Sequence, residues 1–208
     1  MINILLIFTL YLKVMKKIFV IVAFISLLSC KQGKDVSNGN APVTSEQPSS
    51  VYDFTMKTLY GEEKKISDFK GKVLVIVNTA SKCGLTPQYA EIEAFYNNYK
   101  DKGVEVLGFP ANNFLWQEPG TDDEIAKFCE ENYGVSFTMF SKISVKGKDI
   151  DPLYNYLTKR ENNGVLDADV SWNFQKFIID RNGKLITFFS PKTTVTSPEF
   201  LKTIDELL

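Results

Sequence analysis

A continuous apolar run at residues 73–77 constrains the fold of this chain more than any other feature. The run is mostly valine, which is typical of a strand buried on both faces, as in a parallel sheet. Thr86 and Pro87 then predict a helix start, with Thr as the N-cap and Pro at the first helical position. The helix is expected to end before Gly103, and residues 104–109 predict the next strand. This order predicts a right-handed parallel crossover.

Four further segments predict regular structure. Residues 51–61 suggest a short hairpin, and residues 121–133 predict a helix that opens with a capping box. Residues 177–189 predict an antiparallel hairpin around Arg-Asn-Gly. Residues 197–208 predict a final helix whose inward-facing side chains are Phe200, Ile204 and Leu207 or Leu208. A crossover followed by a hairpin and a helix predicts an α/β protein with a thioredoxin-like fold, in which helices flank the central mixed sheet of a single domain.

The first 30 residues are typical of an export signal. From Met15 the chain has two lysines, an apolar run at residues 18–28 and a serine before Cys30. Leu-Leu-Ser-Cys resembles a bacterial lipobox, in which the cysteine is lipidated and becomes the mature N-terminus. We therefore expect a signal peptide over residues 1–30, lipidation at Cys30, and a start at Met15 rather than Met1. A plain cleaved signal and an uncleaved anchor stay open, but the run is short for a membrane span, which needs about 20 residues.

Residues 31–50 are rich in Gly, Ser, Asn, Gln and Pro and predict a flexible linker. The folded domain is then expected over residues 51–208. These segments together predict a protein of the bacterial cell envelope, lipid-anchored to a membrane, with its domain facing the periplasm or the cell surface.

The composition excludes several classes of function. The chain of 208 residues has 24 basic and 25 acidic side chains and a net charge of -1, so it has no basic field to attract nucleic acid. It has 3 Cys and no His, which excludes Cys-His and Ser-His nucleophile pairs and most catalytic zinc sites. We therefore expect no metal and no bound cofactor.

Cys83 lies between the buried strand and the predicted helix. A thiolate is the reactive form of cysteine, and the free N–H groups at a helix N-terminus stabilise it. Lys82 adds a little positive field. Position alone leaves a second interpretation open, in which Cys83 is a small apolar residue of the core.

Three segments resemble the glutathione peroxidase family. They are Val-Asn-Thr-Ala-Ser-Lys-Cys-Gly-Leu-Thr at residues 77–86, Gly-Phe-Pro-Ala-Asn-Asn-Phe at residues 108–114 with Gln-Glu-Pro-Gly at residues 117–120, and Ser-Trp-Asn-Phe at residues 171–174 followed by Lys-Phe. The similarity runs from about Tyr52 to the end of the chain. It implies an oxidoreductase of the response to oxidative stress, a thiol peroxidase that reduces hydrogen peroxide and organic or lipid hydroperoxides.

By this resemblance, the catalytic tetrad of the family falls on Cys83, Gln117, Trp172 and Asn173. Side-chain amides and the indole N–H are neutral donors, and their hydrogen bonds favour a thiolate over a thiol. They would also stabilise the oxygen that departs when Cys83 attacks the peroxide and becomes a sulfenic acid. Taken singly, Gln117 also suits a turn, Trp172 a core and Asn173 a loop backbone.

Cys129 has two interpretations. Its spacing from Ile125 and Phe128 places it on the apolar face of the predicted helix, as expected for a buried core residue. The resemblance instead implies that it resolves the sulfenic acid as a disulfide, which a thioredoxin-like protein or glutathione then reduces. A cysteine on a core face reaches another segment only if the Cα atoms come within about 7 Å. We therefore expect the helix to unwind or shift during turnover.

The chain departs from the family pattern at several positions. Ala111 stands where many members have Cys, which leaves Cys129 as the only resolving candidate in the domain. Asn113, residues 115–116 and Ser171 also differ from the common residues and could alter access of the peroxide. The short segment at residues 148–170 implies, by resemblance, a monomer with an open site that accepts bulky lipid hydroperoxides.

Two rival functions need residues that this sequence lacks, and two others stay open. A thiol–disulfide oxidoreductase usually needs Cys-x-x-Cys, but Thr86 stands at the second position. A copper-delivery protein needs a second nearby Cys and a His. A non-catalytic redox sensor, which relays oxidation to a partner protein, uses the same residues and stays open, as does a purely structural envelope domain.

Overall fold

The computed structural model describes residues 48–208. The predicted signal, the lipidation site at Cys30 and nearly all of the predicted linker lie outside the described residues. In chain order the elements are η1 (Val51–Asp53), β1 (Thr55–Lys57), β2 (Glu63–Lys65), η2 (Ile66–Phe69), β3 (Val73–Thr79), α2 (Gln88–Tyr99), η3 (Lys100–Lys102), β4 (Val104–Pro110), α3 (Asp122–Tyr133), β5 (Thr138–Met139), α4 (Pro152–Thr158), α5 (Arg160–Asn163), β6 (Lys176–Ile179), β7 (Leu185–Phe189) and α6 (Pro198–Asp205).

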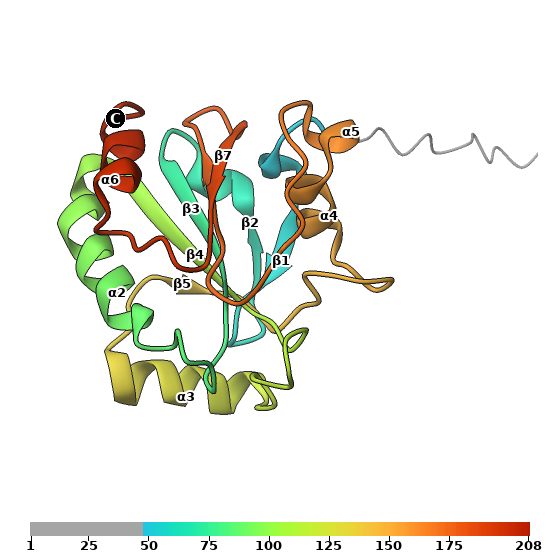
Figure 1. Cartoon of the computed structure of the whole chain (residues 1–208), viewed down its shortest axis with the longest axis vertical. Coiled ribbons are helices and arrows are strands. Elements are labelled where there is room, and N and C mark those ends of the chain that lie inside the picture. Colours follow the sequence, from blue (N-terminus) through green and yellow to red (C-terminus); the bar gives the residue numbers. More distant parts are fainter. Residues whose placement is uncertain (1–47) are drawn as a thin grey trace, which may run out of the picture. The chain divides into compact units, whose positions relative to one another are not determined.

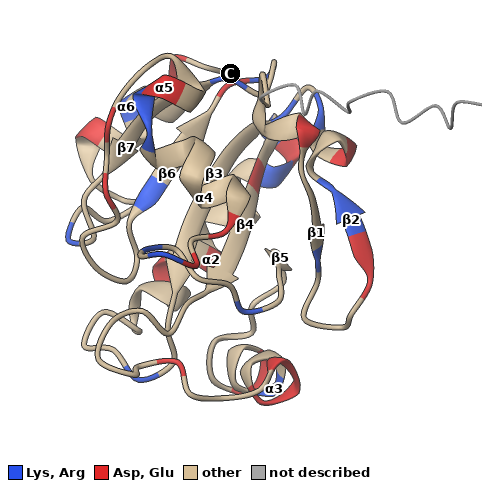
Figure 2. Cartoon of the chain, turned by 90° about the vertical axis from the view of Figure 1, so that its right-hand side faces the viewer, with Lys and Arg blue, Asp and Glu red and all other residues tan. Residues whose placement is uncertain are grey.

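Five strands form the central sheet in the order β5-β4-β3-β6-β7. Strand β3 is parallel to β4 and antiparallel to β6, so the sheet is mixed, as predicted. Every residue of β3 is buried, which confirms that its apolar run lies at the centre with both faces covered. Strands β1 and β2 form a separate antiparallel hairpin beside this sheet (Figure 2).

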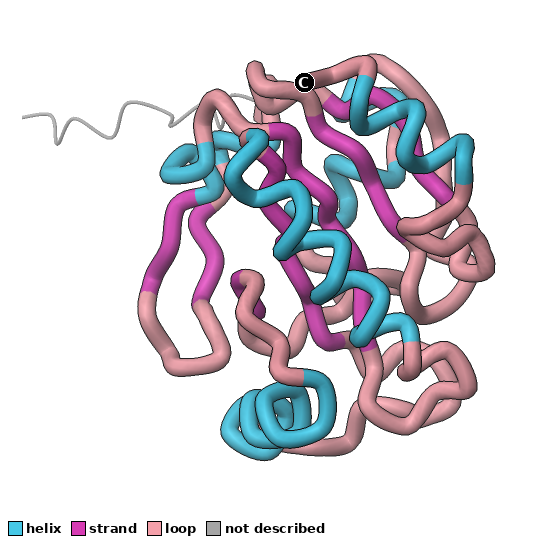
Figure 3. Tube along the Cα trace, turned by 90° about the vertical axis from the view of Figure 1, so that its left-hand side faces the viewer, coloured by secondary structure: helices cyan, strands magenta, loops and turns pink. Residues whose placement is uncertain are grey.

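Helices cover both faces of the sheet (Figures 1 and 3). Val73, Val75 and Val77 pack with α2 and α6 on one face, while Leu74 and Ile76 pack with α4 on the other. Helix α3 lies across the end of the sheet where β3 and β4 finish (Figure 1). Acidic and basic residues are interspersed in the view of Figure 2, and the central strands carry few of either.

The start of α2 differs from its prediction. The helix begins at Gln88, Pro87 occupies the N-cap position, and no side chain caps the helix. Thr86 is not the N-cap because its hydroxyl accepts the Cys83 N–H at 3.0 Å and donates to the Ala80 carbonyl at 2.8 Å. The hydroxyl therefore fixes the turn that precedes the helix.

The other secondary-structure predictions were confirmed in part. The Thr121 capping box of α3, the β6–β7 hairpin and the Ser197 start of α6 are confirmed. The first hairpin is shifted, because residues 51–53 form a 3-10 turn and the strands follow it. Phe200 and Ile204 are buried as predicted, and of the two alternatives after α6, Leu207 packs against the core whereas Leu208 is 39% exposed. Elements β5, α4 and α5 were not predicted, since they are short and have no marked periodicity.

Candidate active site

Three chain segments meet at the end of the sheet above α3. Strands β3 and β4 are parallel and finish side by side, with Thr79 opposite Pro110. Strand β6 runs the other way, with Lys176 opposite Val77, so the residues just before it arrive at the same end. Sheet topology therefore brings together the segments that carry Cys83, Gln117, and Trp172 with Asn173.

The Cys83 side chain lies in the turn between β3 and α2 and is 8% exposed. Its Sγ accepts a hydrogen bond from the Leu85 N–H at 3.4 Å. The Thr86 hydroxyl holds the backbone of the same turn. The sulfur is thus fixed in place, nearly enclosed, and adjacent to a backbone donor.

Gln117 is tied both to the Cys83 turn and to Asn173. Its carbonyl accepts the Lys82 N–H at 2.9 Å, next to the cysteine in sequence. Its side-chain Oε1 accepts a hydrogen bond from Asn173 Nδ2, also at 2.9 Å. Oε1 is used in this way, whereas the Gln117 Nε2 group is a donor that donates to no residue among 48–208.

Trp172 and Asn173 are positioned by the end of β3. The Asn78 side chain donates to the Trp172 carbonyl at 3.1 Å, and the Asn78 carbonyl accepts the Phe174 N–H at 2.6 Å. The half-buried Trp172 packs on Phe114 with ring centroids 5.2 Å apart. Asn173 is fully buried, and its Oδ1 has no hydrogen-bond partner in the described part of the chain.

The structure therefore gathers the four predicted residues at one end of the sheet, with a direct hydrogen bond only between Gln117 and Asn173. Within residues 48–208, neither Gln117, Trp172 nor Asn173 donates to Cys83 Sγ. What the arrangement offers is a thiol beside unused amide and indole donors. No group of metal-ligating side chains occurs among the described residues, and none of their helices is long and apolar enough to span a membrane.

Cys129 is on the core face of α3, as its spacing predicts, and is 2% exposed. Burial raises the pKa of its thiol to about 11, a hydrogen bond with Tyr89 acts to lower it, and the charge of Glu118 adds to the rise. Cys129 packs in the same apolar cluster as Cys83, and both are free thiols. At neutral pH the Cys129 thiol is therefore protonated.

The sequence of this domain matches known proteins. Residues 51–158 match the family described as Glutathione peroxidase. The chain belongs to the glutathione peroxidase family. It is 52% identical over 160 residues to the Glutathione peroxidase homolog BsaA of Halalkalibacterium halodurans. The matched region covers 76% of this chain and 99% of that protein.

Other relatives extend the comparison. Glutathione peroxidase-like peroxiredoxin 2 of Saccharomyces cerevisiae is 50% identical over 149 residues, covering 71% of this chain and 91% of that protein. The solved structure titled "Crystal structure of Trgpx in apo form" has a TM-score of 0.60 at 38% identity and covers 76% of this chain and 95% of that chain. The chain is thus a peroxidase with a thioredoxin-like fold, acting on a peroxide with a thiol reductant. The roles of its individual residues stay predictions.

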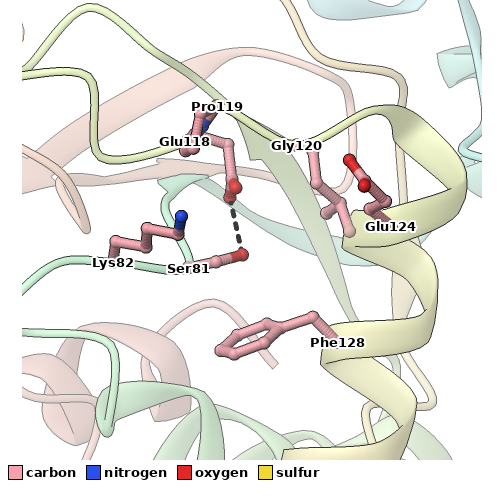
Figure 4. A pocket seen from close by; sticks show the side chains of 8 residues that line it. Ser81, Lys82, Glu118, Pro119, Gly120, Glu124 and Phe128 are labelled. Carbon is pink, nitrogen blue, oxygen red and sulfur yellow. Dashed lines mark hydrogen bonds between the residues drawn. The ribbon is translucent and has the colours of Figure 1, made fainter.

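Glu118 is a site residue of this peroxidase that the sequence analysis missed. It follows Gln117, yet its side chain is 1% exposed and accepts a hydrogen bond from the Ser81 hydroxyl at 3.1 Å. Burial raises the pKa of this carboxyl, while hydrogen bonds from Ser81 and the charge of Lys142 act to lower it. Figure 4 shows the Ser81–Glu118 bond beside a cavity of about 330 Å³ between the Cys83 turn and α3.

Asn78 and Thr86 were missed as positioning residues as well. A polar Asn at the end of an apolar, fully buried strand is a signal that could have identified Asn78. Thr86 was interpreted as a helix cap, the commonest role of Thr before Pro. For Glu118 no such signal exists, because the turn sequence Gln-Glu-Pro-Gly suggests exposure.

Proposed function

We propose that Cys83 is the nucleophile of this thiol peroxidase. The observation that carries the proposal is that the nearly enclosed Cys83 sulfur lies in a turn whose backbone is bonded to Gln117, and that Gln117 in turn accepts a hydrogen bond from Asn173. Trp172, packed beside them, supplies a further neutral donor. Because the domain contains no His, these donors are the groups that favour the thiolate.

In the first step, the Cys83 thiolate attacks one peroxide oxygen, the O–O bond breaks, and a sulfur–oxygen bond forms. The other oxygen leaves with the electron pair and takes a proton, giving water from hydrogen peroxide or an alcohol from an organic hydroperoxide. Sulfur is oxidised by two electrons to the sulfenic acid. Amide and indole N–H groups aimed at the leaving oxygen stabilise its developing charge.

In the second step, the Cys129 sulfur attacks the Cys83 sulfenic acid. A disulfide forms, the sulfenic S–O bond breaks, and the hydroxyl leaves as water with the Cys129 proton. An external thiol, from a thioredoxin-like protein or glutathione, then returns two electrons and restores both thiols. Two observations support this route. Cys83 and Cys129 pack in the same apolar cluster, and position 111 is Ala, so it offers no other resolving Cys.

The substrates proposed are hydrogen peroxide and organic or lipid hydroperoxides, and the enzyme is proposed to act as a monomer. The lipobox-like end at Cys30 supports a lipid anchor in the bacterial cell envelope, and such an anchor would keep the domain near oxidised lipids.

The cycle is tested by rapid mixing. The reduced full-length chain, in detergent, is mixed with hydrogen peroxide or with a lipid hydroperoxide. We expect Cys83→Ser to abolish oxidation. Cys129→Ser should keep the first step and stop at the sulfenic acid, which a dimedone label traps. Mass spectrometry of the wild-type product should show a Cys83–Cys129 disulfide.

Each alternative gives a different result. Fast oxidation of the wild type without that disulfide would indicate a one-cysteine enzyme or a relay of oxidation to a partner protein. Oxidation that survives Cys83→Ser would contradict the assignment of the nucleophile. Activity on hydrogen peroxide alone would remove lipid hydroperoxides from the substrates.

A further inference from the structure

Glu118 makes contacts that the proposed chemistry does not use. A buried carboxylate is costly unless hydrogen bonds compensate for the lost water. Here the compensation comes from Ser81, two residues before Cys83, whose hydroxyl donates to the carboxylate at 3.1 Å. One residue after Ser81 and one residue before Glu118, the Lys82 N–H donates to the Gln117 carbonyl at 2.9 Å. The Cys83 turn is thus fastened to the Gln117 segment by two adjacent bonds, one of which is a side-chain bond.

The Gln117 segment is itself firmly held. The Glu118 N–H donates to Asn112 Oδ1 at 2.9 Å. The Lys142 ammonium donates to the Glu118 and Gly120 carbonyls at 3.3 and 2.5 Å. Glu118 is therefore a fixed attachment point, and the Cys83 turn is the part that would move if the Ser81 bond opened.

Space for such a movement lies beside the bond. The cavity of about 330 Å³ is bounded by Ser81 and Lys82 on one side and by Ile125 and Phe128 of α3 on the other (Figure 4). Cys129 follows Phe128 directly. A disulfide requires Cα atoms about 4.4 to 6.8 Å apart, so we expect the two segments to approach each other across this space when Cys83 and Cys129 join.

We propose that Glu118 is a positioning residue that holds the Cys83 turn in the peroxide-reducing arrangement and has to release Ser81 before the Cys83–Cys129 disulfide forms. This inference rests on the proposed two-cysteine cycle and adds a control point to it. The bond favours the first step, because it keeps the sulfur near Gln117 and Asn173. It opposes the second step, because it keeps the turn away from α3. No further reactant is needed, since the second step releases only water.

The decisive readout is a split between two rates. A residue that only supports the fold would, when changed, lower both rates or neither. Loss of the Ser81–Glu118 bond should instead slow sulfenic acid formation and speed the disulfide step that follows. We expect Ser81→Ala to change each rate by about five- to tenfold, in opposite directions, as for the loss of one typical hydrogen bond.

Ser81→Ala, Ser81→Thr and Glu118→Gln are compared with the wild type in full-length chains. Ser81→Thr keeps the hydroxyl and Glu118→Gln keeps an acceptor, so both should stay within about twofold of the wild type. Ser49→Ala is the matched control, since the Ser49 hydroxyl donates to the Asp53 carboxylate at 3.2 Å, at the start of the described domain and 34 residues before Cys83. Stopped-flow mixing with hydrogen peroxide gives the first rate, and quenched-flow mass spectrometry of the disulfide gives the second.

The outcomes separate the two levels of proposal. If the wild type forms no Cys83–Cys129 disulfide, the proposed cycle itself fails before any variant is compared. If the wild type completes the cycle but Ser81→Ala leaves both rates unchanged, or lowers both, the positioning role of Glu118 is wrong. Opposite shifts in Ser81→Ala that are absent in Ser81→Thr and in Ser49→Ala support it.

Discussion

At the scale of single residues, Lys176 is the most unusual group in the core. It is fully buried in β6, and its ammonium donates to Gln88 Oε1 at 2.5 Å and to the Thr193 and Pro191 carbonyls at 2.8 and 3.4 Å. Burial lowers the pKa of Lys176 to about 8, although the charge of Glu91 acts to raise it. Lys176 thereby ties the sheet to the start of α2, the helix that follows the Cys83 turn.

This pKa predicts a pH dependence of stability. Below about pH 8 both the folded and the unfolded chain carry the proton, and the folded chain bears the cost of a buried charge. The ordinary pKa of a lysine is 10.5, so between about pH 8 and pH 10.5 Lys176 loses its proton in the folded chain but keeps it in the unfolded chain. The free energy of unfolding therefore rises with pH across this window, by about 3 kcal/mol in total. Urea unfolding at pH 7.5 and pH 10, under reducing conditions, measures this gain.

Lys176→Met is the comparison for that prediction, because it has no titrating group in β6. Raised tyrosine pKa values, such as that of Tyr96 at about 12, affect both proteins alike and cancel in the difference. If the wild type and Lys176→Met show the same change between the two pH values, the charge of Lys176 does not limit stability.

Left-handed backbone near the site is another feature of single residues. Leu115, Trp116 and Phe174 have φ angles of 50, 56 and 68°, a region that bulky side chains rarely adopt. Leu115 and Trp116 are also 75% and 81% exposed. Their sequence gives no sign of this conformation, because neither residue favours it. Leu115 and Trp116 are the central residues of a turn that the Gln117 N–H closes by donating to the Phe114 carbonyl at 3.1 Å.

At the scale of elements, the stability of α3 conflicts with the movement that the proposed disulfide requires. Its capping box and its buried Ile125 and Cys129 stabilise a regular helix of 12 residues. The proposed disulfide requires Cys129 to leave the core face. The prediction that α3 unwinds or shifts therefore stands beside a helix that is well formed in the reduced protein.

Hydrogen exchange of the reduced and the trapped disulfide form tests this. We expect amides of residues 121–133 to lose protection in the disulfide form, because Cys129 cannot reach Cys83 while it stays packed beside Tyr89. Helix α2 should remain protected and serves as the internal reference. Oxidised Cys129→Ser, which forms no such disulfide, is the control. Slow exchange throughout α3 in the disulfide form would show that the Cys83 turn alone moves and that α3 stays folded.

At the scale of the whole molecule, the described residues contain both apolar clusters of the domain. Within residues 48–208, the side chains of both clusters lie between Val51 and Leu207, and together they cover the two faces of the sheet. The domain's stability is therefore expected not to depend on the lipidation predicted at Cys30.

Cys30→Ser tests that expectation and the proposed anchor together. In the bacterial host, the wild-type chain should fractionate with membranes and carry an acyl group on Cys30. Cys30→Ser should lack the acyl group and shift toward the soluble fraction, with an unchanged unfolding midpoint and peroxidase rate. If Cys30→Ser stays membrane-bound to the same extent, the apolar segment holds the chain by itself and the lipid anchor is contradicted.

The sequence by itself determined the elements whose signals are local. The apolar run of β3, the capping box of α3 and the Arg-Asn-Gly turn act over a few residues, so the fold class and the place of Cys83 after β3 followed from them. Only the tertiary structure decided which polar groups are buried together. The Ser81–Glu118 bond, the Gln117–Asn173 pair and the Lys176 contacts join residues 37, 56 and 88 positions apart. Such partners meet through sheet topology, and no local pattern encodes them because burial of a polar side chain depends on the distant segment that satisfies it.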